Sequence, residues 1–273
     1  MGLGFLSVSQ AVVPISTGPI EVPILYREAQ SILALFPLEP GALEAELRPL
    51  PLEPVPLLGG KPALVVAFFD YRDTTIGPYH EAAVATIVVP RGVARPQRPL
   101  LDFLLPPHWR RSGLYIFDLP VTTAVANAAG RELWGLPKFV TDIPFSWHDD
   151  RFDVGVCEPG CSERICSLVG YAPAGSRMPL RSLSLYSQLG SHLLRTEVNL
   201  RGMGRVVRSP AVHLHIGSRL HPMAQRLVRL GLDGAMPALL QLAPRFQARL
   251  NLGRRIPVPV AAAVHQERQV EAA

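Results

Sequence analysis

The sequence predicts a mainly β (α+β) fold, in which antiparallel strands and a few peripheral helices form a single domain. Of the 273 residues, 48% are hydrophobic and only 18% are charged, so the chain can bury a large core and is not disordered. Apolar and β-branched runs of strand length recur between prolines and glycines. The predicted strands do not alternate regularly with helices, which argues against a doubly wound parallel sheet. We find no internal repeat or linker and expect one domain over residues 1–273.

The individual elements follow from local composition, in chain order. Residues 1–24 are apolar and rich in proline and glycine, which is typical of an arm or edge strand that packs on the body. Four prolines between positions 49 and 56 exclude a central strand or a helix interior there. Apolar side chains at helical spacing predict helices at 28–35, 122–134, 222–231 and 236–250. Strands are expected at 63–71, 79–89, 114–119, 139–147, 151–157, 164–171 and 204–216. Residues 256–273 are rich in proline and alanine and then polar, so we expect a flexible tail.

The distribution of charge narrows the class of partner. The net charge is +5 and the pI about 9.4, but the arginines are scattered, with Arg110-Arg111 and Arg254-Arg255 as the adjacent pairs. The sequence shows no basic helix face and no alternation of basic and aromatic residues, so we expect no nucleic-acid partner. The excess positive charge favours anionic small molecules.

Nothing in the sequence indicates secretion or a membrane. Residues 1–13 lack the basic start of a secretory signal, and apolar runs such as 63–69 are too short to cross a bilayer. The three cysteines, Cys157, Cys161 and Cys166, are odd in number and lie close together. We therefore expect a cytoplasmic protein with reduced thiols.

Lys138 is unusual because the chain nearly avoids lysine. Lysine and arginine number 27 together, yet Lys61 and Lys138 are the two lysines of the sequence. Lys61 lies in a Gly-Gly-Lys-Pro turn, whereas Lys138 lies between apolar neighbours in the stretch 130–140. Desolvation disfavours an ammonium, and a neutral amine can attack a carbonyl to form a Schiff base. The alternative is a surface lysine whose stem is packed and whose head is in water.

Two further charged residues are candidates for the same site. Glu81 opens an apolar strand after a turn that presents Tyr79 and His80. Its carboxylate either points into the interior or faces water beside an arginine. Arg27 follows the apolar residues 24–26 and is a candidate partner for Glu81, or for a substrate carboxylate that it would grip with two hydrogen bonds.

The sequence favours no metal or phosphate site. His213 and His215 share one face of a predicted strand, but no third ligand is indicated nearby. Cys157, Cys161 and Cys166 do not have the spacing of common zinc sites. The chain contains neither a glycine-rich phosphate loop nor a Gly-x-Ser-x-Gly nucleophile turn.

Three segments together resemble the acetoacetate decarboxylase family. They are Tyr26-Arg27, the Gly-Pro-Tyr-His-Glu run at 77–81 and the Gly-Arg-Glu-Leu-Trp-Gly-Leu-Pro-Lys run at 130–138, and the resemblance spans roughly residues 20–250. It implies a closed, cone-like barrel of antiparallel strands that assembles into homo-oligomers and uses no metal or organic cofactor. It also implies that Lys138 forms the Schiff base, and that Glu81 and Arg27 line the same cavity.

The sequence departs from the family pattern beside the lysine. Characterised decarboxylases carry a second lysine directly after the first, and acetoacetate decarboxylase is the standard example of a lysine activated by a neighbouring cation. Here that position is Phe139, and Leu136 replaces a tyrosine two residues before the lysine. We therefore expect burial to activate Lys138, and we expect Leu136 and Phe139 to alter the fit of the substrate.

The resemblance implies a Schiff-base lyase that decarboxylates a small-molecule β-keto acid. Lys138 and Glu81 are the expected catalytic residues, and the expected substrate-binding residues are Arg27, Tyr79, Leu136 and Phe139. An aldolase or dehydratase that acts on pyruvate-type 2-oxo acids through the same lysine remains open. So does a non-catalytic barrel that binds a small ligand.

Overall fold

A closed barrel of seven strands forms the centre of the protein. The computed structural model describes residues 4–57, 59–172, 175–208 and 210–257. Around the barrel the order is β6 (Tyr79–Pro90), β5 (Ala63–Thr74), β3 (Ile24–Pro37), β16 (Leu239–Leu250), β14 (His192–Arg208), β13 (Leu183–Leu189) and β7 (Gly113–Val121). The pairing of β6 with β7 closes the ring. The pairs are antiparallel except β13–β7, so the prediction of a mainly β, barrel-like domain is confirmed.

Shorter strands extend or flank the barrel. β8 (Lys138–Val140) adds to β7 in parallel, β4 (Leu52–Pro54) pairs with β6, and both β12 (Ser176–Pro179) and β17 (Arg254–Ile256) pair with β14. A separate four-stranded sheet has the order β15 (Ala211–Ile216), β11 (Arg164–Tyr171), β10 (Arg151–Cys157) and β9 (Phe145–His148). The N-terminal arm forms a small hairpin of β1 (Ala11–Val13) and β2 (Ile20–Val22).

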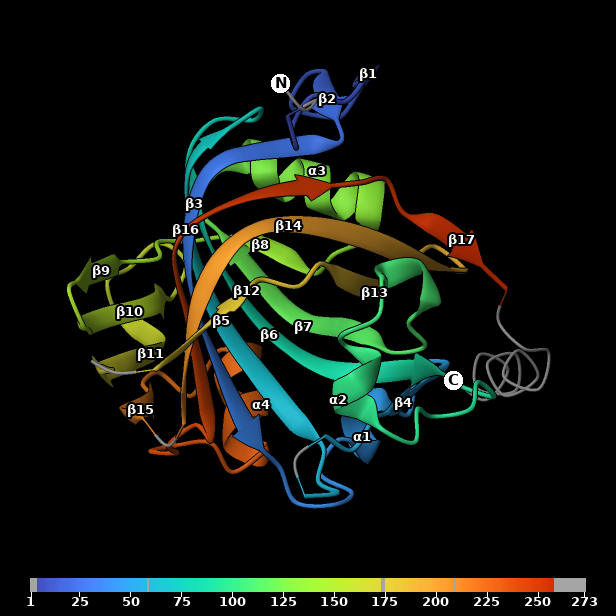
Figure 1. The fold of residues 1–273 in the computed structure, drawn as a ribbon. Coiled ribbons are helices and arrows are strands. Elements are labelled where there is room, and N and C mark those ends of the chain that lie inside the picture. The colour runs from blue at the N-terminus through green and yellow to red at the C-terminus, as the bar shows by residue number, and fades with distance from the viewer. Residues whose placement is uncertain (1–3, 58, 173–174, 209, 258–273) are drawn as a thin grey trace.

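Four α-helices of the described residues lie outside the barrel. They are α1 (Glu44–Leu47), α2 (Pro99–Asp102), α3 (Ala124–Trp134) and α4 (Pro222–Arg229), and a short 3-10 helix spans Pro107–Trp109. In Figure 1, α3 lies across the upper end of the barrel next to the β1–β2 hairpin, and α1 and α4 lie toward the opposite end. The four-stranded sheet stands at the side (Figure 1).

The barrel wall has two packed faces because consecutive side chains of a strand point to opposite sides. Along β5, Leu64, Val66 and Phe68 belong to an outer core that includes residues of α4 and of the four-stranded sheet. Val65 and Ala67 belong to a second cluster in the barrel interior. The outer core fixes the wall, and the inner face is left to form a cavity.

Two predicted helices are strands in the structure. Residues 28–35 belong to β3 and residues 239–250 to β16, so both helix predictions are wrong. β3 is central and largely buried, and such a strand loses the alternation of apolar and polar residues that identifies a half-exposed strand. In β16 buried residues do alternate with part-buried ones, but the exposed pair Pro244-Arg245 interrupts this alternation. Breaks in the pairing register near Glu28 and between Ala243 and Phe246 disturb the pattern further. The predicted helices at 122–134 and 222–231 are confirmed as α3 and α4.

Other differences concern the ends of elements. The predicted strand at 139–147 is two short strands, β8 and β9, and the strand at 204–216 is divided between β14 and β15. Ile256, placed in the predicted tail, closes β17. Residues 258–273 of that tail lie outside the described residues.

Candidate active site

Helix α3 and the turn after it position Lys138 at the barrel. The hydroxyl of Thr123 accepts a hydrogen bond from the backbone N–H of Ala126 and caps the start of the helix. Gly135 ends it in the left-handed region with φ 60°, and a Cβ there would lie 2.1 Å from the carbonyl oxygen of Gln188. Both the conformation and the lack of space therefore require glycine. Three residues later β8 begins at Lys138, beside Leu119 of β7.

Gly130 makes room for the lysine stem. A Cβ at this position would lie 2.4 Å from both Cδ and Cε of Lys138. Glycine in a helix interior is less favourable than alanine by about 1 kcal/mol, so its presence here has a local reason. One residue on, the guanidinium of Arg131 donates to the backbone oxygen of Lys138 at 2.9 Å and fixes the start of β8.

The amine of Lys138 meets the carboxylate of Glu81 inside the barrel. Nζ donates to Oε2 at 2.6 Å, and the two side chains are only 5% and 10% exposed. The hydroxyl of Tyr71 donates to the other carboxylate oxygen at 3.3 Å. The structure thus brings together two residues 57 positions apart that the sequence singled out separately.

Three buried tyrosines surround this ion pair. The hydroxyls of Tyr26 and Tyr79 are 3.0 Å apart, and the ring of Tyr71 packs on both, with centroid distances of 4.5 and 4.8 Å. Nζ of Lys138 lies 5.7 Å from the centre of the Tyr79 ring, in reach of a cation–π interaction. Burial raises the pKa of all three phenols, and the negative charge of Glu81 raises the pKa of each further. They therefore remain protonated and can act as hydrogen-bond donors.

A cavity of about 180 Å³ opens beside the ion pair, within the barrel. Lys138, Glu81, Tyr71 and Tyr26 provide polar groups on its wall, and Ser31, Gln241 and Arg181 contribute three more. The remaining wall is aliphatic or aromatic, with Val65, Ala67, Ala83, Ile116, Leu185 and Phe246 among its members. A nucleophilic amine at an apolar cavity is suited to a small carbonyl compound.

The structure places the four predicted substrate-binding residues differently. Leu136 lines the cavity, whereas Tyr79 lies behind it, hydrogen-bonded to Tyr26. Arg27 is not among the lining residues: its side chain is 48% exposed and forms an ion pair with Asp73 at 3.0 Å. The expectation that Arg27 lines the cavity is therefore corrected, because its neighbour Tyr26 occupies the inward-facing position of the strand.

Phe139 points to the opposite side of the barrel wall from Lys138. Its ring lies 4.9 Å from the ring of His221, at the start of α4, and packs against the outer core. The position at which characterised decarboxylases carry a second lysine thus faces away from the cavity in this chain. The expectation that Phe139 contacts the substrate is therefore corrected, because its side chain lies on the outer face of the barrel wall.

Sequence reasoning did not find Tyr26, Tyr71 and Arg181 as cavity residues. Tyr71 continues the inward series Val65, Ala67 and Phe69, so the alternation along the predicted strand contained a signal. Arg181 lies beside a turn-rich stretch for which the sequence predicted no regular structure. It is the one arginine among the described residues that line the cavity.

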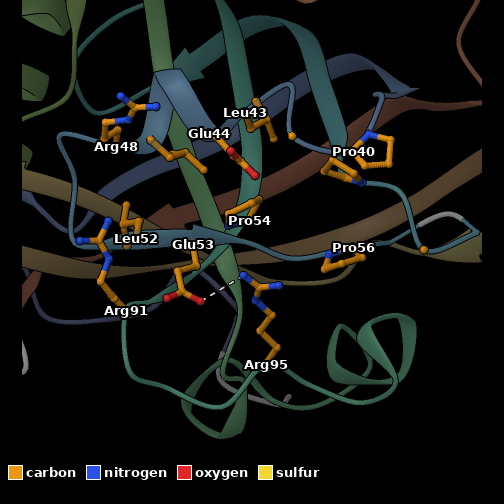
Figure 2. Close-up of a pocket in the computed structure, with 14 residues that line it drawn as sticks. Pro40, Leu43, Glu44, Arg48, Leu52, Glu53, Pro54, Pro56, Arg91 and Arg95 are labelled. Atoms are coloured by element: carbon orange, nitrogen blue, oxygen red, sulfur yellow. Dashed lines mark hydrogen bonds and ion pairs between the residues drawn. The ribbon is translucent and has the colours of Figure 1, made fainter.

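A second pocket, of about 410 Å³, lies on the outer surface (Figure 2). Residues between 40 and 62 line it together with Arg91 and Arg95, and Arg95 pairs with Glu53 at 3.1 Å. The described residues of this lining include no lysine, cysteine or histidine. Its charged groups are accessible to water, so we place the chemistry at Lys138 despite the smaller volume there.

The described residues offer no group of three or more His, Cys, Asp or Glu side chains that could hold a metal ion. His213 and His215 stack on β15 with ring centroids 6.1 Å apart. Within the described chain, no helix has the length and apolar character needed to span a membrane.

Fold and site together define a β-barrel with a buried lysine–carboxylate pair facing a small apolar cavity. The family model described as acetoacetate decarboxylase (ADC) matches residues 12–170, which is more than half of the chain. The chain belongs to this family. A comparison with curated proteins gave no significant match.

Solved structures of low identity share the fold. Acetoacetate decarboxylase from Legionella pneumophila subsp. pneumophila str. Philadelphia 1 has a TM-score of 0.63 at 15% identity, over 93% of this chain and 94% of the other. An acetoacetate decarboxylase-like enzyme from Sphingomonas wittichii RW1 has a TM-score of 0.58 at 15% identity, over 86% and 92%. The enduracididine biosynthesis enzyme MppR, complexed with the condensation product of pyruvate and imidazole 4-carboxaldehyde, has a TM-score of 0.55 at 15% identity, over 85% and 88%.

Proposed function

We propose that this protein is a Schiff-base lyase that decarboxylates a β-keto acid through Lys138. The observation that carries the proposal is the 2.6 Å contact between Lys138 and Glu81, both buried beside an apolar cavity. Membership of the acetoacetate decarboxylase family supports it at the level of the reaction class. The particular β-keto acid is a separate question.

Glu81 activates the amine of Lys138 by accepting its proton. In this chain that role replaces the neighbouring cation of characterised decarboxylases. The ammonium proton of Lys138 passes along the hydrogen bond to Glu81, which leaves a neutral amine and a carboxylic acid. The amine attacks the ketone carbon, and the carbinolamine takes up a proton and loses water to give an iminium ion. Glu81 is positioned to return the proton for that loss, and the hydroxyl of Tyr71 holds its other oxygen.

The iminium ion then acts as the electron sink. The bond between the carboxyl carbon and the α-carbon breaks, CO2 leaves, and its electron pair moves to the iminium nitrogen through the α-carbon, giving an enamine. Protonation of the α-carbon regenerates the iminium ion, and water releases the ketone and free Lys138. The apolar wall favours the departure of CO2, because the carboxylate charge is poorly solvated there and disperses as the bond breaks.

The charge of the cavity wall favours a β-keto acid over a 2-oxo acid. A 2-oxo acid would place its carboxylate directly on the imine carbon, beside Glu81. Among the described lining residues, Lys138 and Arg181 are the cations, and the positive charge at Lys138 passes to the iminium nitrogen, where it serves as the electron sink. An aldolase or dehydratase remains the second candidate, because MppR, which is seen with a condensation product of pyruvate, has a similar fold.

Borohydride trapping tests the proposal. Reduction in the presence of acetoacetate, followed by peptide mass mapping, should place an adduct on Lys138. Lys61 is an internal control in the same chain, since its exposed amine pairs with Glu39 at 2.7 Å on the surface. Absence of an adduct on Lys138 over a range of keto acids would contradict the proposal and favour a non-catalytic ligand-binding barrel.

A product assay separates the two reaction classes. We expect CO2 release from β-keto acids and no condensation of pyruvate with an aldehyde. The reverse result would assign the aldolase reaction. A homo-oligomeric assembly and a cytoplasmic location remain predictions, to be measured by light scattering and by fractionation of cells.

A further inference from the structure

The cavity continues away from Lys138 along a lane of small side chains. The inward residues that follow Glu81 on β6 are Ala83 and Ala85, and both line the cavity. Across the sheet, Ala83 pairs with Ala67 and Ala85 with Val65. Glu81 and Ala85 are four positions apart along the strand, a length of about 13 Å.

The wall that encloses this lane is apolar. Ile116, Leu119, Leu185, Leu200 and Phe246 contribute to it from four other strands of the barrel. A volume of about 180 Å³ spread over this length leaves a narrow space, suited to an extended chain more than to a ring. Apart from the reactive pair and its tyrosines, the polar residues in the described part of the lining are Ser31, Gln241 and Arg181, of which Arg181 is exposed.

We infer that the preferred substrate is a 3-oxo acid with an unbranched aliphatic tail longer than the methyl group of acetoacetate. This inference rests on the proposed function, because it places the ketone carbon at Lys138 and the carboxylate beside it. The tail then lies along Ala83 and Ala85 and replaces water at an apolar wall. A polar or second acidic group on the tail would lose its hydration in the lane and find few partners.

A chain-length series tests the inference on the unmodified protein. CO2 release is measured with 3-oxobutanoate, 3-oxohexanoate and 3-oxooctanoate, with the uncatalysed rate subtracted. Each buried methylene contributes roughly fourfold, so kcat/KM should rise by about 15-fold for each pair until the lane is filled. A tail with a phenyl ring should react more slowly than the linear tail of equal carbon number. A flat or falling series would overturn the inference.

A variant whose larger side chain fills the lane provides a second test of the inference. Ala83→Leu adds a side chain within the lane, and the rise in kcat/KM per pair of methylenes should fall to twofold or less. Ala211→Leu is the matched control, because it makes the same change at an exposed position of β15 outside the cavity. The control should keep the wild-type gradient, and loss of the gradient in both variants would overturn the assignment of the lane.

A binding measurement covers the case in which Ala83→Leu does not fold. Inhibition of the wild-type protein by 2-butanone, 2-hexanone and 2-octanone reports tail binding without decarboxylation, since these ketones carry no carboxylate. Inhibition constants that fall with chain length support the inference, and constants that are independent of it overturn it. Failure of the proposed function looks different: no 3-oxo acid would then give an adduct on Lys138, whatever the length of its tail.

Discussion

Two buried ion pairs lie on opposite sides of the same barrel wall, and they differ in how fully their charges are matched. Inside, Lys138 has one carboxylate partner, Glu81, and both side chains line a cavity. Outside, Arg226 of α4 pairs with Asp118 of β7 and also with Glu46 of α1, the latter at 2.9 Å. Glu46 in turn accepts from Arg229 at 2.6 Å.

The difference between the inner ion pair and the outer network indicates which buried charges can take part in a reaction. The outer network joins two helices to the barrel, and none of its members lines the cavity. Burial raises the pKa of Asp118 even though Arg226 acts to lower it. The inner pair holds a proton between two groups that a carbonyl compound can reach. A saturated network stabilises packing, whereas a single pair beside a cavity can exchange its proton and its partner.

Removal of the inner cation should have the largest effect, and it should fall on catalysis. For Lys138→Met we expect kcat/KM to fall by ~10⁴-fold or more, equivalent to ~5.5 kcal/mol, because Lys138 is the one lysine among the described residues that line the cavity. The measurement is CO2 release together with borohydride trapping. Lys61→Met is the matched control and should keep full activity. A Lys138→Met protein with more than a hundredth of the wild-type rate would contradict the assigned role.

Removal of the outer cation should instead lower stability. Arg226→Met leaves Asp118 buried without its partner, so we expect a loss of about 3 kcal/mol in the free energy of unfolding, and little change in activity per folded molecule. Urea titration measures it, with Arg229→Met as the control, since that arginine is 57% exposed and should contribute less than about 1 kcal/mol.

The effect of Arg226→Met should depend on pH with a definite sign. The folded-state pKa of Asp118 already lies above its ordinary value because of burial, and loss of Arg226 removes an influence that lowers it. The deficit in the free energy of unfolding is therefore fully present above the folded-state pKa of Asp118 in the variant, and it shrinks as the pH falls toward the lower folded-state pKa of Asp118 in the wild type. A deficit that grows on acidification would show that Asp118 is not the group left unpaired.

Gly130→Ala should displace the inner amine without unfolding the helix. The new Cβ would overlap Cδ and Cε of Lys138, a flexible stem that can move, so the cost falls on the position of Nζ. We expect a loss of ~10²-fold in kcat, as a displacement of about 1 Å can produce. Alanine favours the helix, so the unfolding midpoint should not fall. Stopped-flow trapping with borohydride measures the imine directly, and a wild-type trapping rate would refute the packing role of Gly130.

The inner and outer faces of the barrel wall also differ in how much of them could be predicted from the sequence. Lys138 was singled out by the scarcity of lysine and by its apolar neighbours, Glu81 by its place at the start of an apolar strand, and the family motifs contain both. The barrel followed from the runs of strand length and from the same resemblance. Arg27 was misplaced because sequence proximity to Tyr26 does not tell which of two neighbours points inward. A register break near Glu28 makes the choice of face depend on the pairing partner, which is a property of the folded sheet.

The outer network could not be predicted for a different reason. Arg226 and Asp118 are 108 positions apart, and Arg226 and Glu46 are 180 apart. No local pattern joins them, because the contact exists only after α4 docks on β7. β3 was mistaken for a helix because burial on both faces removes the polar positions that set a period. β16 was mistaken for a helix because the exposed pair Pro244-Arg245 interrupts its alternation.

The smallest effect on activity is expected at Phe139, the residue beside the reactive lysine. Its ring packs outside the barrel against His221, so Phe139→Leu should lower stability by about 1 kcal/mol and change kcat/KM by less than twofold. Leu136→Phe is the comparison, since Leu136 lines the cavity and a larger ring there should shift the preference among 3-oxo acids. Both variants are assayed with the same substrate series and the same urea titration. If Phe139→Leu lowers kcat as strongly as Leu136→Phe, the two faces are not separate, and the side chain after Lys138 contributes to activation from behind the wall.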